Sequence, residues 1–334
     1  MRGISFFSEN TYVSIPNRKK PKVVLAIGRK SMAKNSFKIY NPFSVKAKIF
    51  KSVVRFFYVN FNAIILELFD FDKYDNSEFI NFLNEEFQIK FTSSVYHATL
   101  KDKVVVQLQS EGLVFGYVKF PMNKMGLKNI RNEINAIELL SEKGILNLQM
   151  KSMEFKGTPF FVLPELQGNI ANIPDNEVLK LVEPYKKEVL LKLEEQARII
   201  EIKDFFIENK LKNELEILEN ILKNSKEYYH EVYEHGDFAP WNIVKTKEGL
   251  AAFDFEYFTE KGLEYFDLIK YHFQVGRLLK GKNQQDLYQY ISQKINIKEI
   301  KEILSLFLLK EIMSAFQQEK TADFESKMLN FINA

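Results

Sequence analysis

Two short segments hold the residue types that could do chemistry. One is His235-Gly236-Asp237 with Asn242 just beyond it, and the other is Asp254-Phe255-Glu256. Carboxylate and amide oxygens can ligate magnesium, and a nearby carboxylate can orient a hydroxyl or accept its proton. Phosphoryl transfer asks a protein for such positioning and charge neutralisation rather than for covalent chemistry. The pattern therefore predicts Asp237, Asn242 and Asp254 as catalytic residues. Asn242 and Asp254 would hold Mg²⁺, and Glu256 would either join them or cap local backbone.

A hairpin is predicted between the two segments. Apolar residues in 242–246 and 250–254 flank Lys247-Glu248-Gly249, where glycine suits the turn. A register symmetric about Glu248 would place Val244 opposite Ala252 and Asn242 opposite Asp254. The two candidate magnesium ligands would then lie side by side at the open end of the hairpin.

A helix is predicted over residues 127–141, because apolar residues from Ile130 to Leu140 recur at helical spacing. Glu133 falls on the same apolar stripe. A buried carboxylate is costly unless a cation meets it, so the helix predicts a partner for Glu133. The best candidate is Lys119, which interrupts an apolar strand just before the helix.

The elements around these residues change in type along the chain. Strands predicted over residues 94–99, 104–109 and 113–120 form a small antiparallel sheet, and an apolar strand over 159–163 precedes a connector. The later segments have helical patterns, over residues 176–206, 211–229, 265–279, 284–295 and 297–331, the last of which is expected to contain a break. A strand-rich unit joined by one connector to a helical unit predicts a cleft between them.

Residues 1–90 show no chemical motif. They mix β-rich runs over 22–27 and 36–40 with predicted helices over 44–57 and 77–87. We expect an N-terminal α/β extension of open role, for which a docking module for a partner enzyme is one interpretation.

Composition excludes several classes of site and partner. The 334 residues carry 47 basic and 44 acidic side chains, a net charge of +3 that gives no reason to expect nucleic acid as a partner. Cysteine is absent, which removes disulfides and thiolate metal sites, and four histidines are too few for a confident zinc cluster.

The chain has one basic run, Arg18-Lys19-Lys20-Pro21-Lys22, which we interpret as a solvated loop, with contact to an anion or a membrane surface as the alternative. The apolar window at residues 56–66 is far short of the roughly 20 residues that cross a bilayer. We therefore expect a cytoplasmic protein without a membrane span.

His235-Gly236-Asp237 and Asn242 with Asp254-Phe255-Glu256 resemble the catalytic core of the aminoglycoside phosphotransferase and choline kinase group. The resemblance implies an α+β, bilobal protein-kinase-like fold with a small antiparallel-sheet N-lobe over residues 91–165 and a mainly helical C-lobe over 166–334. It does not cover residues 1–90.

The resemblance also implies roles in binding ATP. Lys119 would contact the α and β phosphates while Glu133 fixes its rotamer, and Leu163 would lie behind the adenine. The Pro164 carbonyl would accept a hydrogen bond from the adenine amino group, and the Leu166 N–H would donate to the ring. The phosphate-covering turn at 99–103 contains no glycine, so this turn would either bind the phosphates less tightly or use Lys101 or Lys103 instead.

For three further residues near the motif we expect mainly structural roles. Asp267 matches a family residue that supports the catalytic loop. His235 is expected to hydrogen-bond the loop backbone, and Trp241 to pack beneath the loop.

The predicted activity is transfer of the γ-phosphate of ATP to a hydroxyl of a small molecule, because residues 255–264 are too few for a protein-kinase activation segment. Acceptors in the resembling group include aminoglycosides, amino-alcohols and sugars, and analogy favours a sugar or glycoconjugate. A cationic acceptor would call for acidic residues such as Glu256, Glu260 and Glu264. The alternative is a catalytically inactive nucleotide-binding regulatory protein of the same fold.

Overall fold

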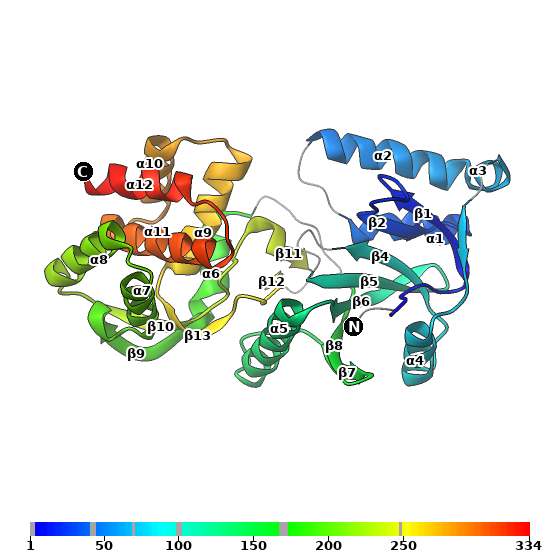
Figure 1. Ribbon diagram of the computed structural model, residues 1–334, viewed down its shortest axis with the longest axis horizontal. Helices are drawn as coiled ribbons and strands as arrows, with labels where there is room; N and C mark the ends of the chain where they lie inside the picture. Colours follow the sequence, from blue (N-terminus) through cyan, green and yellow to red (C-terminus); the bar gives the residue numbers. More distant parts are fainter. Residues whose placement is uncertain (1–3, 41–44, 69–70, 98–101, 167–172, 247–248) are drawn as a thin grey trace. The chain divides into compact units, whose positions relative to one another are not determined.

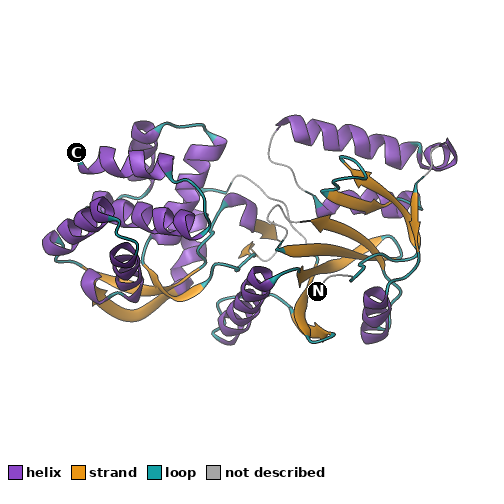
Figure 2. Ribbon diagram, in the orientation of Figure 1, coloured by secondary structure: helices purple, strands orange, loops and turns teal. Residues whose placement is uncertain are grey.

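The computed structural model describes residues 4–40, 45–68, 71–97, 102–166, 173–246 and 249–334. The chain divides into two compact units. Unit 1 comprises Met1–Ser141 and Asn147–Leu166, and unit 2 comprises Glu142–Leu146 and Gln167–Ala334. Helices and strands are mixed as in the α+β class, with the large sheet in unit 1 and most helices in unit 2 (Figures 1 and 2).

Unit 1 is built on an eight-stranded sheet, antiparallel throughout, in the order β3-β1-β2-β4-β5-β6-β8-β7. The strands are β1 (Asn10–Ile15), β2 (Val23–Ala26), β3 (Asp72–Tyr74), β4 (Thr92–His97), β5 (Lys103–Ser110), β6 (Leu113–Pro121), β7 (Lys151–Phe155) and β8 (Thr158–Pro164). The first three come from the region expected as a separate extension. The sheet thus continues across the boundary at residue 90 that the sequence predicts.

Both faces of this sheet are buried, and β2 shows why. Successive side chains on a strand point to opposite faces. Val24 and Ala26 belong to a core cluster with Phe79 and Phe120, whereas Val23 and Leu25 belong to a second cluster around Phe37. An unbroken apolar strand is therefore suited to the middle of this layered unit.

Helices cover the sheet of unit 1, and Figure 1 shows α2 lying along it. They are α1 (Lys30–Ser36), α2 (Val45–Asn60), α3 (Asn62–Leu68), α4 (Glu78–Phe87) and α5 (Lys124–Glu142). Ser77 caps α4 by accepting a hydrogen bond from the N–H of Ile80 at 3.3 Å. No single described helix is long and apolar enough to cross a membrane. The consecutive segments Lys48–Asn60 and Asn62–Leu68 reach that length only together, and they are bent by 87°.

The β-rich run expected at residues 36–40 is wrong. α1 extends to Ser36, and Phe37–Ile39 continues it as a 3-10 turn. Ala33 and Phe37 are spaced four apart, so a helix puts both into the cluster with Leu25. A strand would also bring the polar Asn35 onto the face that holds Ala33 and Phe37.

Unit 2 is mainly helical. Its helices are α6 (Asp175–Val182), α7 (Ala197–Glu208), α8 (Lys212–Asn224), α9 (Phe266–Gln274), α10 (Gln284–Lys294), α11 (Ile300–Gln317) and α12 (Asp323–Asn333). A three-stranded sheet contains β9 (Lys186–Lys192), β10 (Tyr228–Glu234) and β13 (Thr259–Leu263), and β11 (Ile243–Thr246) pairs with β12 (Gly249–Ala252).

Two helix predictions in unit 2 are too long. The helix expected over 176–206 breaks at Glu183–Tyr185, where Pro184 lacks the N–H that a helix interior needs, and the chain then forms β9. The helix expected over 211–229 ends at Asn224, because residues 228–234 pair with β9 and β13. In both places, pairing with a distant segment turned residues that were predicted as helix into strand.

Candidate active site

The loop from His235 to Asn242 follows β10 and ends in a 3-10 turn at Pro240–Asn242. Gly236 has φ +81°, and a Cβ there would lie 2.3 Å from the carbonyl oxygen of Tyr257. Only glycine fits this backbone and this close approach. Asn242 closes the loop, since its Nδ2 donates to the Asp237 carbonyl at 2.8 Å and to Asp237 Oδ2 at 3.1 Å.

Two buried side chains fix the loop from below. The Asp267 carboxylate accepts from the N–H of His235 at 2.6 Å and from the N–H of Gly236 at 3.0 Å. The His235 ring contacts the carbonyl of Phe253 through Nε2 at 3.0 Å, and Nδ1 accepts from the N–H of Asp237 at 3.3 Å. His235 therefore hydrogen-bonds the loop backbone, as the sequence predicts.

The hairpin register differs from the prediction by one residue. Val244 pairs with Ala251 and Ile243 with Ala252, and the N–H of Phe253 donates to the carbonyl of Asn242 at 3.0 Å. Asn242 thus lies opposite Phe253 rather than Asp254. The reason is that Thr246 pairs with Gly249, which puts the centre of the turn half a residue earlier than Glu248.

Asp254 comes two residues after β12, with φ +71°. Few residues other than glycine adopt this left-handed conformation, although aspartate is among those that tolerate it best, and it is often found at functional sites. Burial raises the pKa of Asp237, and the charge of Asp254 raises it further. The two carboxylates are therefore close enough to repel one another.

A cation could relieve this repulsion. Magnesium prefers oxygen ligands, and Asp254 supplies a carboxylate while Asn242 supplies an amide oxygen once its nitrogen is committed to Asp237. In the described part of the chain, no three His, Cys, Asp or Glu side chains are grouped to hold a metal. Glu256 therefore does not complete such a group with Asp237 and Asp254. Asn242 and Asp254 carry the types of oxygen that Mg²⁺ prefers.

Beneath the loop lies a buried ionic network, which we define as Arg198, Glu234, Lys270, Lys310 and Glu311. Glu234 Oε1 lies 3.2 Å from Arg198 Nη2 and 3.2 Å from Lys310 Nζ. Glu311 bridges Lys310 at 3.2 Å and Lys270 at 2.6 Å. Lys270 Nζ is also 3.9 Å from Asp237 Oδ1, so the network extends to the candidate base.

The basic residues of this network shift the pKa values of its acidic residues. Burial alone would raise the pKa of Glu311, but Lys270 and Lys310 lower it to about 2. Burial would likewise raise the pKa of Glu234, but Arg198 and Lys310 hold it below its usual value. Asp267 has the opposite outcome, because burial and the charge of Glu234 raise its pKa. The network thus keeps its own acids ionised in the interior of unit 2.

The sequence motifs did not predict this network, although a signal was present. Lys270 stands inside the buried stretch Phe266–Phe273, and Lys310-Glu311 interrupts the apolar run of α11. A charge on a buried stripe requires a partner, as Glu133 does. The sequence cannot say which distant charge that partner is.

Unit 1 holds the other predicted pair. Lys119 Nζ on β6 lies 2.5 Å from Glu133 Oε1 on α5, and both side chains are buried. Lys119 Nζ also lies 5.7 Å from the centre of the Phe161 ring. The predicted Lys119–Glu133 ion pair is confirmed.

The remaining predicted residues are placed as follows. Pro164 ends β8 and pairs with Gly116, while Leu163 is buried. Leu166 is half-buried after the strand. Residues 99–101 of the predicted phosphate-covering turn lie outside the described residues, and Lys103 begins β5.

Of the acidic residues considered for a cationic acceptor, Glu264 is already engaged. It is buried, lies 3.1 Å from Lys186 Nζ, and accepts from the N–H of His230 at 2.9 Å. Glu260 is exposed on β13, and Glu256 is half-buried. Glu264 therefore has a structural partner.

No protein-family model and no curated protein sequence matches the chain. Among solved structures, it is similar to choline kinase LicA from Streptococcus pneumoniae, with 16% identity over 75% of this chain and 96% of that chain and a TM-score of 0.47. It is also similar to an ethanolamine kinase of Plasmodium vivax, with 13% identity over 91% of this chain and 94% of that chain and a TM-score of 0.41. A third similar structure is an ADP-bound aminoglycoside phosphotransferase, with 14% identity over 75% of this chain and 95% of that chain and a TM-score of 0.42. These are small-molecule kinases of the group that the sequence motifs resemble.

Proposed function

We propose that the chain is a kinase that moves the γ-phosphate of ATP to a hydroxyl of a small molecule with the help of Mg²⁺. The observation that carries the proposal is the arrangement around Asp237. Its carboxylate is held by Asn242, lies close to the charge of Asp254 and sits on a loop fixed by Asp267. These are the groups that phosphoryl transfer needs from a protein.

Asp237 would orient the acceptor hydroxyl and accept its proton. The acceptor oxygen forms a bond to the γ-phosphorus, the bond from that phosphorus to the β–γ bridging oxygen breaks, and ADP leaves. Burial raises the pKa of Asp237, which makes it a stronger proton acceptor than an exposed aspartate. Asn242 keeps the carboxylate in place through the hydrogen bond at 3.1 Å.

The other predicted residues would bind the nucleotide. Asn242 and Asp254 would hold Mg²⁺, which when bound neutralises charge on the phosphate oxygens. Lys119 would contact the α and β phosphates, and its ion pair with Glu133 at 2.5 Å restricts its rotamer. The Pro164 carbonyl and the Leu166 N–H would bind the adenine.

A neutral acceptor, such as a sugar or glycoconjugate, is favoured over an aminoglycoside or an amino-alcohol. Lys270 Nζ lies 3.9 Å from Asp237 Oδ1, so a cation already stands next to the candidate base. Glu264, which could have attracted a cationic acceptor, is paired with Lys186. Both features reduce the electrostatic attraction of this region for a second positive charge.

The test is consumption of ATP with Mg²⁺ across a panel of sugars, amino-alcohols and aminoglycosides. Asp237→Ala should reduce turnover of the preferred acceptor by roughly 10² to 10⁴-fold, the usual contribution of a positioned base. Asp204→Ala, at an exposed aspartate of α7, is the control and should leave turnover unchanged. ATP binding without acceptor-dependent turnover of any member of the panel would instead support the inactive nucleotide-binding protein.

A further inference from the structure

The outer side of α2 and the turn after it form an exposed apolar face, which we define as Ile49, Phe50, Val53, Phe56, Phe57 and Phe61. Each of these side chains is between 42 and 60% exposed. Ile64 and Leu68 of α3 continue the face with similar or greater exposure. Three of the rings contact one another, with centroids 5.9 to 6.1 Å apart. The apolar face is therefore one continuous surface rather than scattered residues.

The opposite side of α2 is also apolar. Val54 and Tyr58 pack against the cluster that contains Val23, Leu25 and Phe37. A surface helix that buries one stripe normally shows polar residues on the other side. Because α2 shows aromatic residues there, its outer side is suited to a second apolar environment.

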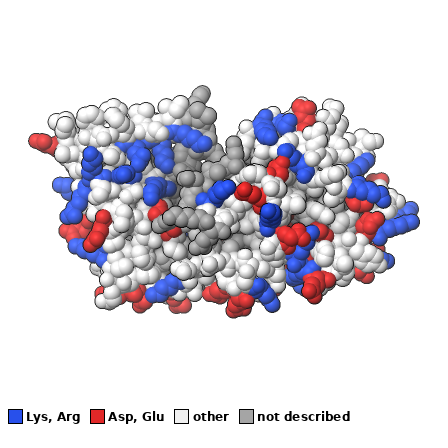
Figure 3. All heavy atoms as spheres, turned by 180° about the vertical axis from the view of Figure 1, so that it is seen from behind, with Lys and Arg blue, Asp and Glu red and all other residues white. Residues whose placement is uncertain are grey.

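Basic side chains predominate near the apolar face, although Glu67 of α3 is an exposed acidic residue beside it. The segment Val45–Asn60 contains Lys46, Lys48, Lys51 and Arg55 and no acidic residue. The basic run Arg18–Lys22 joins β1 to β2, and its Lys19, Lys20 and Lys22 are exposed. Figure 3 shows, at the top left where α2 lies, uncharged surface with Lys and Arg side chains gathered beneath it. The surroundings of the face are thus complementary to an anionic surface.

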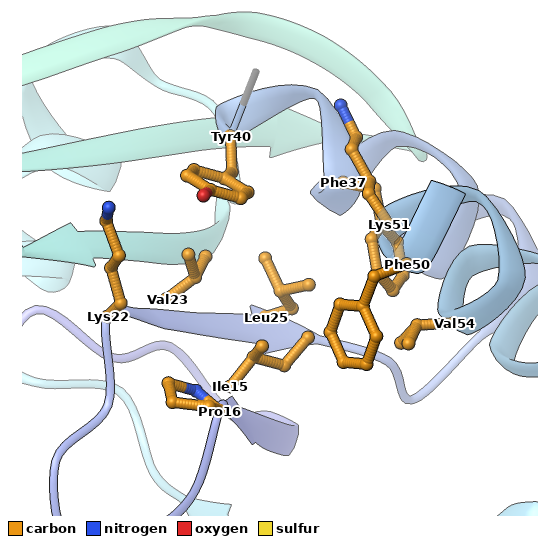
Figure 4. Close-up of a pocket in the computed structure, with 10 residues that line it drawn as sticks. All are labelled: Ile15, Pro16, Lys22, Val23, Leu25, Phe37, Tyr40, Phe50, Lys51 and Val54. Carbon is orange, nitrogen blue, oxygen red and sulfur yellow. The ribbon is translucent and has the colours of Figure 1, made fainter. Parts of the chain in front are cut away.

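A pocket of about 220 Å³ opens beside the face, between α2 and β2 (Figure 4). Its walls include Val23, Leu25 and Phe50, and Lys22 and Lys51 lie on opposite sides of it with Tyr40 between them. An apolar interior flanked by two ammonium groups matches an acyl chain joined to an anionic headgroup. The basic run and the apolar face are joined by this one pocket.

We propose that α2 and α3 dock the protein onto the surface of an anionic lipid bilayer. Phenylalanines next to lysines and arginines are typical of helices that lie in the membrane interface, and each basic residue near an anionic surface adds to the attraction. The bend of 87° between the two helices lets both lie against a surface without spanning it. A second copy of the chain is disfavoured, because a two-fold interface would bring this basic region against itself.

Flotation of the full chain with lipid vesicles tests the proposal. We expect binding to vesicles of phosphatidylcholine with 30% phosphatidylglycerol, about tenfold or more weaker binding to phosphatidylcholine alone, and loss of binding as salt is raised. The variant Phe56→Ser with Phe57→Ser should reduce binding by about tenfold or more. Leu278→Ser with Leu279→Ser, at exposed leucines of unit 2, is the matched control and should bind as wild type does.

Charge is tested separately. Lys48→Glu with Arg55→Glu should lower binding to anionic vesicles by about tenfold or more. Lys223→Glu with Lys226→Glu makes the same change in net charge at exposed positions of unit 2 and should have little effect. Equal losses in both charge variants would overturn the proposal, because net charge alone would then explain binding.

A site-specific probe removes the ambiguity of a variant that fails to fold. Trp241 is the only tryptophan, so Trp241→Phe combined with Phe57→Trp places one reporter on the apolar face. Its emission should shift to the blue with anionic vesicles and be quenched by brominated acyl chains. The absence of both effects overturns the proposal. So does concentration-dependent dimerisation that Phe56→Ser with Phe57→Ser abolishes, since the face would then bind a second copy.

Discussion

Both units bury charges, but they compensate them differently. In unit 1, Lys119 and Glu133 pair across 14 positions of sequence, between a strand and the helix that follows it. In unit 2, the ionic network joins residues such as Arg198 and Glu234, 36 positions apart, and Lys270 and Glu311, 41 apart. A network can retain compensation, except where one acid stands between two cations.

Glu234→Gln should have the largest effect on stability. Glu234 is fully buried between Arg198 and Lys310, so the change leaves two buried cations without their shared acid. We expect unit 2 to lose about 4 kcal/mol, as for other broken buried pairs. Urea unfolding followed by Trp241 fluorescence measures the loss. Glu201→Gln removes the exposed partner of Arg198 and should cost less than about 1 kcal/mol.

Glu133→Gln is the corresponding change in unit 1. It leaves Lys119 without its buried carboxylate, although the Phe161 ring still lies near the ammonium group. We expect a cost of about 3 kcal/mol, seen as faster hydrogen exchange of the β6 and α5 amides. Glu138→Gln, at an exposed position of the same helix, is the control. A Trp241 unfolding curve that moved as far as in Glu234→Gln would contradict the separation of the two regions.

The same contrast explains how much of the site could be predicted. Glu133 stands out because a carboxylate interrupts an apolar stripe, and the nearest interrupted strand supplies Lys119. The loop residues Asp237 and Asn242 stand out by type and spacing. Lys270 and Lys310 interrupt apolar helices in the same way, but packing between distant segments chooses their partners. Local pattern therefore predicted the pair and not the network.

The fold shows the same limit. The helix over 127–141 and the strands of residues 94–120 follow from local periodicity and were predicted. β9 and the first two residues of β10 were expected as helix, because the pairing of these strands with each other and with β13 is not local. The hairpin register also shifted by one residue, since a pattern of apolar residues does not fix which ones pair across the turn.

His272 is a buried titratable group that lies outside the ionic network. It is buried on α9, and burial lowers its pKa from 6.5 to about 4. As pH falls below about 6.5, the unfolded chain takes up the proton first, so the stability that this residue contributes is lost between pH 6.5 and 4. Asp267, whose pKa is raised, has the opposite effect on the pH dependence of stability. Asp267 is present in both wild type and His272→Leu, the two proteins compared next.

Unfolding of wild type and His272→Leu at pH 7 and pH 5 isolates this effect. The difference in stability between the two proteins should change by about 2 kcal/mol over that interval, with wild type losing more on acidification. Trp241 fluorescence again reports on unit 2. Parallel losses in both proteins would mean that the pKa of His272 is the same in the folded and in the unfolded chain.

Lys270→Met should have the smallest effect, for the reason that separates a network from a pair. Glu311 loses Lys270 at 2.6 Å but keeps Lys310 at 3.2 Å, and methionine retains most of the buried apolar stem. We expect a cost of about 1 kcal/mol from urea unfolding, below the cost of Lys119→Met in unit 1, where Glu133 would lose the cation with which it pairs at 2.5 Å. Equal costs for Lys270→Met and Glu234→Gln would mean that the five charges behave as independent pairs. The remaining partner of each charge would then not compensate for the partner that was removed.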